Sequence, residues 1–335
     1  MISYTEGEMR RVLDVLKLKI RKKKFSSSKF PLFIFICGEQ ILDENNQIIA
    51  PEELRRLKNK RQYIVDATNK IESRAVVGII AERLIETFSE HDSLTFEGIL
   101  ADVSDEIIII VESAGTFCEL GAFSFSQNLI NKLYIINDKV HEADESFINR
   151  GPIRKISSSR TGKCKYIEYD TDSWNGDKDL GEHFSQWEKR RITYTPPKEV
   201  KYQKGIRYEI DIKNFVYELL NVLGIFQPIS QNEFLEIYKY LRGEFSIKDS
   251  QDKIKQVNIV FDMLVKLGLI EKVDRYYWST IKNKTSCNNY MFELSIGETE
   301  AQRARVASEY LKEEKWRVRG LDHDNIRENV RRFGT

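Results

Sequence analysis

The stretch EIIIIVESAGTFCE, residues 106–119, joins an uninterrupted apolar run to a turn of small residues and the start of a helical pattern. A run of β-branched residues of this kind is typical of a strand that is buried on both faces, as in the centre of a parallel sheet. Ser113, Ala114 and Gly115 allow a ligand to approach the backbone closely, and we expect the next helix to start near Thr116. The stretch therefore predicts a central strand that leads through a tight turn into a helix.

Two further apolar runs flank this strand in the sequence, LFIFICG at residues 32–38 and KLYII at residues 132–136. Between the three runs the apolar residues follow helical spacing, at residues 76–88, 94–103 and 118–129. Strands that alternate with helices require crossover connections, and these produce a parallel sheet with helices on both faces. The sequence thus predicts an α/β domain over residues 31–170.

The segments on either side of this domain have a different character. Residues 1–30 hold an amphipathic helix that ends in the basic run 21–24, which suits either a solvated helix end or contact with a nucleic-acid backbone. Residues 171–204 are polar, and we interpret them as a connector with a helical piece at 180–191.

Residues 205–296 predict a smaller, mostly helical domain of the winged-helix type. Helical patterns at 215–223, 231–241 and 254–267 precede Gly268, which suits a left-handed helix cap. A strand, a polar turn at Asp274-Arg275 and an aromatic strand follow, as in a wing. Domains of this kind bind nucleic acid or protein, and the basic, helical tail at 297–335 favours nucleic acid.

Composition excludes several classes of function. The 53 basic and 52 acidic residues leave a net charge of +1, which selects no class of partner. No apolar run is long enough to span a membrane, and the polar N-terminus lacks a signal core, so we expect a cytoplasmic protein. The scattered cysteines and histidines predict no metal site and no disulfide framework. The loop after residue 38 has no dinucleotide-binding or P-loop pattern, and we expect no cofactor.

Chemistry is expected where two predicted strands end, because ligands of open parallel sheets bind outside the carboxyl ends of the strands. The first end carries Gly38 and Glu39, and the second carries residues 112–119. The free N–H groups at the start of the helix expected near Thr116 would point into the turn, and Glu119 would face the same crevice. Glu119 is either a capping-box partner of Thr116 or a carboxylate nucleophile that the helix dipole keeps ionised at neutral pH.

Four segments carry a resemblance to a known family: FICG at 35–38, FEGILAD at 96–102, ESAGTFCELGAFS at 112–124 and SFINRGPIR at 146–154. They resemble the nucleoside deoxyribosyltransferase-like effectors of bacterial retrons. The similarity covers about residues 32–156, and the C-terminal region fits the same architecture without a sharp motif. The acidic Glu39 departs from the pattern, since it stands where a second glycine would suit a phosphate.

The resemblance implies roles for individual residues. Glu119 would attack the anomeric carbon of the sugar, and Glu97 would assist, with Asp102 as the alternative for Glu97. A solvated helix face is the simpler explanation for Glu97 and Asp102. The implied substrate-binding residues are Gly38, Glu39, Asp102, Ser113, Gly115, Thr116 and Asn149.

The resemblance also implies a function in anti-phage defence. Such effectors cleave the N-glycosidic bond of a nucleotide, with NAD⁺ the favoured substrate, and are held in check by a retron reverse transcriptase and its msDNA, an RNA–DNA hybrid. A higher-order oligomer is compatible with this role. The alternatives are a purine nucleotide glycosidase, transfer of ADP-ribose to a macromolecule, and, in another class, a nucleotide-sensing DNA-binding regulator without catalysis.

Overall fold

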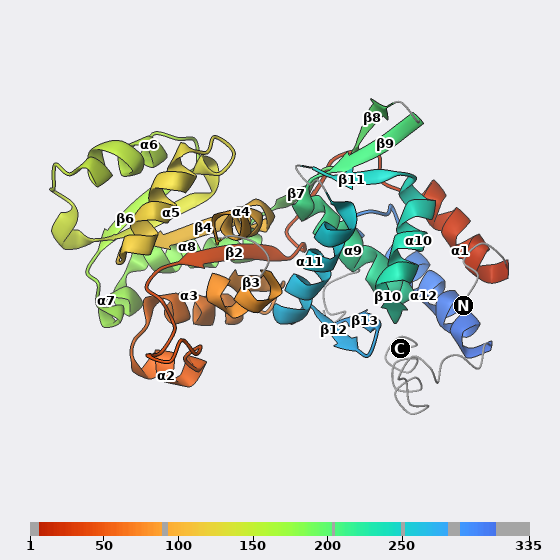
Figure 1. Cartoon of the computed structure of the whole chain (residues 1–335), viewed down its shortest axis with the longest axis horizontal. Helices are drawn as coiled ribbons and strands as arrows, with labels where there is room; N and C mark the ends of the chain where they lie inside the picture. Colours follow the sequence, from red (N-terminus) through yellow and green to blue (C-terminus); the bar gives the residue numbers. More distant parts are fainter. Residues whose placement is uncertain (1–6, 89–92, 203–204, 249–251, 281–288, 313–335) are drawn as a thin grey trace. The chain divides into compact units, whose positions relative to one another are not determined.

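Figure 1 shows a computed structural model of the chain, which describes residues 7–88, 93–202, 205–248, 252–280 and 289–312. The chain divides into two compact units. The first, which we call the sheet unit, is Ser28–Ile192. The second, which we call the helical unit, combines Met1–Ser27 with Thr193–Thr335, so the N-terminal helix belongs with the C-terminal part of the chain.

A five-stranded parallel sheet forms the centre of the sheet unit and confirms the predicted α/β class. Its strand order is β3-β2-β4-β5-β6. The strands are β2 (Leu32–Cys37), β3 (Val76–Ile79), β4 (Glu106–Ile110), β5 (Leu133–Asp138) and β6 (Lys163–Ile167). Strand β2 pairs with β3 on one side and with β4 on the other, so the direction of winding reverses between β2 and β4. This reversal is the topological switch point of the sheet.

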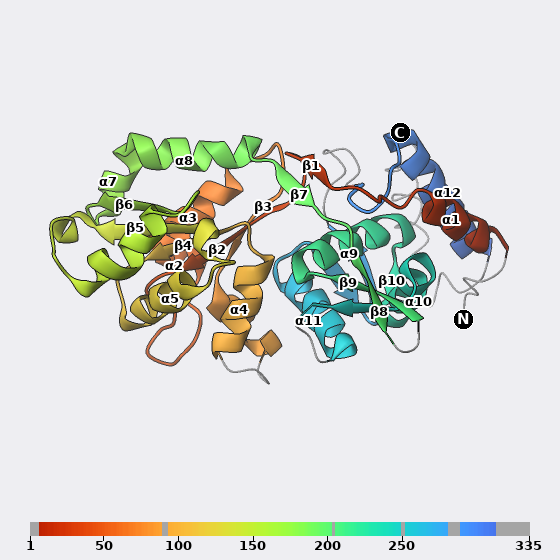
Figure 2. The ribbon, with the colours of Figure 1, turned by 90° about the horizontal axis from the view of Figure 1, so that it is seen from above.

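Every residue of β2 and β4 is buried, as the apolar runs predicted. Figure 2 shows helices on both faces of the sheet, with α3 (Lys60–Asn69) and α8 (Lys178–Lys189) on one and α4 (Ser93–Val103) and α5 (Ala114–Phe125) on the other. The ring of Tyr63 in α3 lies 5.7 Å from that of Trp174 and 6.4 Å from that of Phe184, between ring centroids. The shorter elements of the unit are α2 (Pro51–Arg56), η1 (Ala81–Phe88), η2 (Ile130–Lys132), η3 (Lys139–His141), the π-helix η4 (Asn149–Ile153), α6 (Arg154–Ser157) and α7 (Thr171–Gly176).

The prediction of a helix over residues 76–88 is wrong for its first part. Val76–Ile79 forms strand β3, in which Val76 pairs with Leu32 and Ile79 with Phe35, and only Ala81–Phe88 is helical, as the 3₁₀ segment η1. The β-branched residues of this short run favour a strand, and pairing with the buried β2 decides the outcome. Strand β6 was missed, because its lysines at 163 and 165 interrupt the apolar pattern on an edge strand.

Residues 171–192, expected to form a connector, pack as part of the sheet unit. Trp187 of α8 is buried, and His183 Nε2 lies 2.6 Å from the carboxylate of the buried Glu106 at the start of β4. Arg190 also binds the Glu106 carboxylate. The helix pattern of this segment was visible in the sequence, but its attachment to a buried carboxylate far away along the chain was not.

In the helical unit, α9 (Ile212–Phe226) is buried along nearly its whole length. It contacts α10 (Gln231–Arg242) and α12 (Ile296–Lys312), and α1 (Gly7–Leu18) packs on the same two helices. The other elements are α11 (Lys253–Lys266), β1 (Phe25–Ser27) paired with β7 (Ile192–Tyr194), the sheet of β8 (Lys198–Tyr202), β9 (Gly205–Ile210) and β11 (Phe245–Ile247), and the sheet of β10 (Ile229–Ser230), β13 (Tyr276–Ser279) and β12 (Ile270–Val273).

The local order expected for residues 254–279 is present. Helix α11 ends before Gly268, whose φ of +68° is the left-handed value that favours glycine. Strands β12 and β13 then pair antiparallel around the turn at Asp274. The predicted helical tail is observed as α12 up to Lys312, and residues 313–335 lie outside the described residues. No helix in the part of the chain that the structure describes is both long enough and apolar enough to cross a bilayer.

A closed network of polar side chains lies in the core of the helical unit. Glu218 is fully buried, and its carboxylate accepts hydrogen bonds from the hydroxyls of Tyr194 and Tyr238 and from the guanidinium of Arg242. The hydroxyl of Tyr238 and the Nε of Arg242 lie 2.6 and 3.1 Å from the same carboxylate oxygen. Each buried charge therefore has its partners, which is the condition under which a buried ion pair is tolerated.

We expect Arg242→Met to destabilise the helical unit by about 3–5 kcal/mol, because it leaves Glu218 charged and buried without its cation. Urea unfolding of the full chain, followed by circular dichroism, measures the change. The double variant Glu218→Leu/Arg242→Met removes both charges and should recover most of the loss. A single variant that unfolds at the wild-type urea concentration would show that the pair contributes nothing to stability.

Candidate active site

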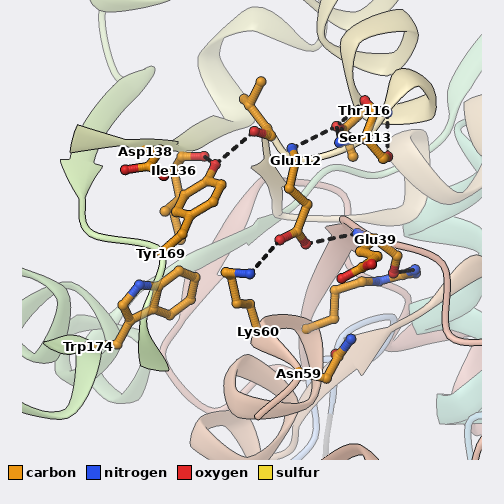
Figure 3. A network of polar contacts seen from close by, with 12 residues as sticks. Glu39, Asn59, Lys60, Glu112, Ser113, Thr116, Ile136, Asp138, Tyr169 and Trp174 are labelled. Atoms are coloured by element: carbon orange, nitrogen blue, oxygen red, sulfur yellow. Dashed lines mark hydrogen bonds and ion pairs between the residues drawn. The ribbon is translucent and has the colours of Figure 1, made fainter. Parts of the chain in front are cut away.

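Two loops meet at the carboxyl edge of the sheet, where the strand order reverses. Gly38 and Glu39 follow β2, and Glu112 and Ser113 follow β4 shortly after its end. The backbone N–H of Glu39 donates a hydrogen bond of 2.8 Å to Glu112 Oε1, as Figure 3 shows. The sequence placed these loops at strand ends, and the β2–β4 pairing makes them neighbours.

Glu112 continues the network toward the next strands (Figure 3). Its Oε2 accepts a hydrogen bond of 2.8 Å from Lys60 Nζ, and that ammonium lies 4.9 Å from the ring centroid of Tyr169. The Tyr169 hydroxyl lies 2.9 Å from the carbonyl oxygens of both Val111 and Ile136. These contacts fix the backbone around the switch point. Lys60 and Tyr169 were not predicted, because they come from elements far from residues 112–119 in the sequence.

The N-terminus of α5 is closed by its own side chains. Thr116 N donates to Ser113 Oγ at 3.3 Å, and Thr116 Oγ1 accepts from Ser113 N at 3.0 Å, which makes these two residues the capping box. The alternative in which Glu119 is a capping partner of Thr116 is therefore wrong. Ser113 and Thr116 hold the turn, while Gly115 at the start of the helix is exposed.

Glu119 lies one turn further along α5, among charged and polar groups from four other elements. Cys37 of β2, Arg61 of α3, Glu82 of η1 and Glu97 of α4 all act on its carboxyl group. Its Oε2 atom is buried and has no hydrogen-bond partner among the residues that the structure describes. This oxygen is therefore an acceptor whose protein partner is lacking, which a substrate or water can supply.

The surroundings of Glu119 oppose its ionisation. Burial and the neighbouring Glu97 carboxylate raise its pKa to about 7, against the opposing effects of Arg61 and of a hydrogen bond from the Cys37 thiol. The helix dipole was expected to keep this group ionised at neutral pH, whereas burial and a second carboxylate raise its pKa to about that value. Raised carboxyl pKa values of this size are typical of groups with a function.

Glu97 is half-buried in α4, and burial together with Glu82 raises its pKa, while Arg61 opposes the shift. The structure thus brings together the two carboxyl groups that the resemblance singled out. Carboxyl groups that share a low-dielectric region lose their protons in sequence, so one can be ionised while the other is protonated. This is the condition that glycosidic-bond chemistry requires.

Arg61 and Glu82 form a buried ion pair beside these carboxylates. The two terminal nitrogens of Arg61 donate to the two oxygens of Glu82 at 2.6 and 2.7 Å, and one of them also donates to the Glu39 carbonyl oxygen at 3.1 Å. Neither residue was predicted to belong to the site. A sequence alone does not show that an arginine in α3 and a glutamate in η1 meet at the carboxyl edge.

Gly38 lies against the side chains of Arg61 and Glu112. A Cβ atom at this position would lie 2.7 and 2.8 Å from Cγ and Cδ of Arg61 and 3.0 Å from Glu112 Oε1. Both backbone groups of Glu39 are hydrogen-bonded within the protein, its N–H to Glu112 and its carbonyl to Arg61, and its side chain is exposed. The structure therefore gives the Gly38-Glu39 turn a role in holding the two loops.

Asp102 and Asn149 are not brought to Glu119 by any contact that the described residues show. Asp102 is exposed at the C-terminal end of α4, where its carbonyl accepts from Lys132 Nζ at 3.1 Å, before the start of β5. The amide of Asn149 donates to the carbonyl oxygens of His141 and Asp144 at 2.7 and 2.8 Å and accepts from the Tyr166 hydroxyl at 3.0 Å. Asn149 therefore closes a loop.

No group of metal-binding side chains occurs among the described residues.

Comparison with known proteins finds relatives from bacterial retrons. The chain is 26% identical over 261 residues to the "Retron Ec73 putative ribosyltransferase/DNA-binding protein" of Escherichia coli, which covers 75% of this chain and 78% of that protein. It is 45% identical over 82 residues to the "Retron Ec86 putative ribosyltransferase/DNA-binding protein" of Escherichia coli, a match that covers 24% of this chain and 27% of that protein.

The family described as STM3845 retron effector protein matches residues 57–272. This match begins before α3 and ends within β12, so it includes Arg61, Glu97 and Glu119 and reaches into the helical unit. It spans more than half of the chain, which therefore belongs to the STM3845 family of retron effector proteins.

Proposed function

We propose that this retron effector cleaves the N-glycosidic bond of a nucleotide, with NAD⁺ as the favoured substrate and Glu119 as the nucleophile. The observation that carries the proposal is the Glu119 carboxyl group. Its buried Oε2 atom has no partner among the described residues and lies beside a second carboxyl group at the switch point. The names of the two Escherichia coli relatives, which contain the word ribosyltransferase, support chemistry at a sugar.

The reaction proceeds in two steps. The ionised Glu119 carboxylate attacks C1′ of the ribose, the C1′–N bond breaks, and its electron pair leaves with the nicotinamide, whose positive charge is thereby neutralised. Water then attacks C1′ of the glycosyl ester, releases Glu119 and gives up one proton. The developing positive charge on the sugar is stabilised by the carboxylate in both steps.

Glu97 accepts the proton of the attacking water in the second step. Its raised pKa makes it a better base than an ordinary glutamate. A purine leaving group would instead need a proton from an acid, and protonated Glu97 is the candidate donor. Cleavage of purine nucleotides therefore remains an alternative that uses the same two residues, and transfer of ADP-ribose to a macromolecule replaces the water by another nucleophile.

The helical unit is proposed to connect this chemistry to the retron. Helix α11 and the β12–β13 pair have the order of a winged helix, and the names of both relatives contain the words DNA-binding. We propose that this unit contacts the msDNA or the reverse transcriptase, which inhibit the sheet unit. A nucleotide-sensing DNA-binding regulator without catalysis is the second candidate, favoured by the same words in the relatives' names.

We expect purified protein, freed of its inhibitors, to release nicotinamide from NAD⁺, and Glu119→Gln to lower the rate at least about 10³-fold, because the amide cannot act as the nucleophile. Glu97→Gln should lower the rate by about 10²-fold, as for the loss of a general base. Chromatography of the products measures the rate.

The matched control is Glu188→Gln, an exposed glutamate of α8 in the same unit. This variant should keep the wild-type rate. Equal rates for Glu119→Gln and Glu188→Gln would end the assignment of the nucleophile, and wild-type protein that binds but never cleaves nucleotides would favour the regulator.

The rate should also depend on pH in one direction. Because the pKa of Glu119 is raised to about 7 and the ionised form attacks, kcat/KM should fall about tenfold per pH unit below pH 7 and level off above it. Rates measured from pH 5.5 to 8.5 test this. A profile that stays flat through pH 7 would contradict the role of Glu119.

The same carboxyl group should cost the protein stability at high pH. Its pKa rises on folding from 4.5 to about 7, so the folded state binds the proton more tightly than the unfolded state, and stability falls as the pH rises between these values. Glu119→Gln has no proton to lose and should be the more stable protein above pH 7, by on the order of 3 kcal/mol.

Urea unfolding at pH 5 and pH 8.5 measures this difference, which should be small at the lower pH. A variant that gains stability while losing activity is expected of a group retained for chemistry. A constant difference between variant and wild type at the two pH values would show that Glu119 ionises in its ordinary range.

A further inference from the structure

The ion pair of Arg61 and Glu82 lies where the proposed reaction needs a controlled charge. Arg61 is 2% exposed, and its side chain is fixed by Glu82, by the Glu39 carbonyl and by contact with Gly38. Burying two charges costs several kcal/mol per ion before their attraction is counted. A pair of this kind is weak evidence for stability, so its location asks for another explanation.

A comparison within the chain separates this pair from a structural one. In the helical unit, the Nε and a terminal nitrogen of Arg242 both bind Glu218, whose oxygens also accept two tyrosine hydroxyls. Arg61 binds Glu82 with its terminal nitrogens only, and its buried Nε has no partner among the described residues. Both arginines bind their glutamate through two nitrogens, but only for Arg61 do the described residues leave a buried N–H without a partner.

The groups that act on Glu119 come from β2, α3, η1 and α4. Burial, Glu97 and Glu82 raise its pKa, whereas Arg61 and the Cys37 thiol lower it. Arg61 and Glu82 thus act on Glu119 with opposite signs. The same two groups act with opposite signs on Glu97, where Glu82 raises the pKa and Arg61 lowers it.

We infer that Arg61 is a positioning residue that sets the charge of Glu119, and that Glu82 fixes its guanidinium so that it acts on Glu119 through space. The inference rests on the proposed function of Glu119 as the nucleophile. A direct two-pronged pair between Arg61 and Glu119 would hold both carboxylate oxygens and keep them from a sugar. Instead, each terminal nitrogen of Arg61 donates one hydrogen bond to Glu82, and the Oε2 atom of Glu119 has no hydrogen-bond partner among the described residues.

The test measures the ionisation of Glu119 directly. Full-length protein is prepared with ¹³C-labelled glutamate carboxyl groups, and the Glu119 signal is identified by its absence in Glu119→Gln. We expect Glu82→Gln to lower the midpoint of its titration and Arg61→Gln to raise it, by about one pH unit each. The double variant Arg61→Gln/Glu82→Gln should titrate close to wild type.

The matched control is Arg55→Gln, which removes a positive charge from an ion pair in the same unit. In this pair, Arg55 Nε lies 2.7 Å from Asp66 Oδ2. It should leave the Glu119 midpoint unchanged. If Arg61→Gln does not fold, Arg61→Lys keeps the charge, and the Glu82→Gln variant alone decides. A lower Glu119 midpoint in Glu82→Gln supports the inference, and an unchanged or higher midpoint overturns it.

The pH dependence of NAD⁺ cleavage is the second measurement, and its acid limb should move with the midpoint in each variant. If the acid limb moves in the Arg61 and Glu82 variants but not in Arg55→Gln, a purely structural role of Arg61 and Glu82 is excluded. If the Glu119 midpoint shifts as expected, down in Glu82→Gln and up in Arg61→Gln, but the protein cleaves no nucleotide, the proposed function is overturned. Cleavage that depends on Glu119 but whose pH limb ignores both variants would overturn only this inference.

Discussion

The pairing of β2 with β4 is the constraint on which the candidate site depends. The two strands are neighbours in a parallel sheet whose winding reverses between them, so the loops that follow them meet at one edge. Glu112 then joins the loops through the backbone of Glu39 and the ammonium of Lys60. With this edge fixed, the capped start of α5 directs Glu119 toward residues of β2, α3, η1 and α4.

The electrostatics of the site follow from this concentration of acidic groups. Three glutamates from three helical elements are held in a partly buried region with a single arginine acting on all of them. Desolvation and repulsion disfavour the charged forms of Glu97 and Glu119, whereas burial of Glu82 is outweighed by its ion pair with Arg61, which lowers its pKa. Replacement of a buried ion pair by apolar side chains is often neutral for stability, so stability alone does not account for this cluster.

The two units handle buried charge in different ways. In the helical unit, Glu218 is surrounded by donors that use its oxygens fully. In the sheet unit, Glu106 is likewise bound by His183 and Arg190, and its pKa is lowered by these partners although burial opposes them. Glu119 differs from both, because an oxygen of its carboxyl group has no hydrogen-bond partner among the residues that the structure describes.

The sequence by itself determined the parallel α/β class, the central strands and the position of Glu119 after a turn of small residues, because local patterns of apolar and small residues specify these features. It could not determine that Val76–Ile79 forms a strand, since a short β-branched run acquires that state only by pairing with β2. Nor could it reveal Arg61, Glu82 or the reason for Gly38, which depend on contacts between elements separated along the chain. The raised pKa of Glu119 likewise depends on burial and on neighbouring charges, which only the tertiary structure brings together.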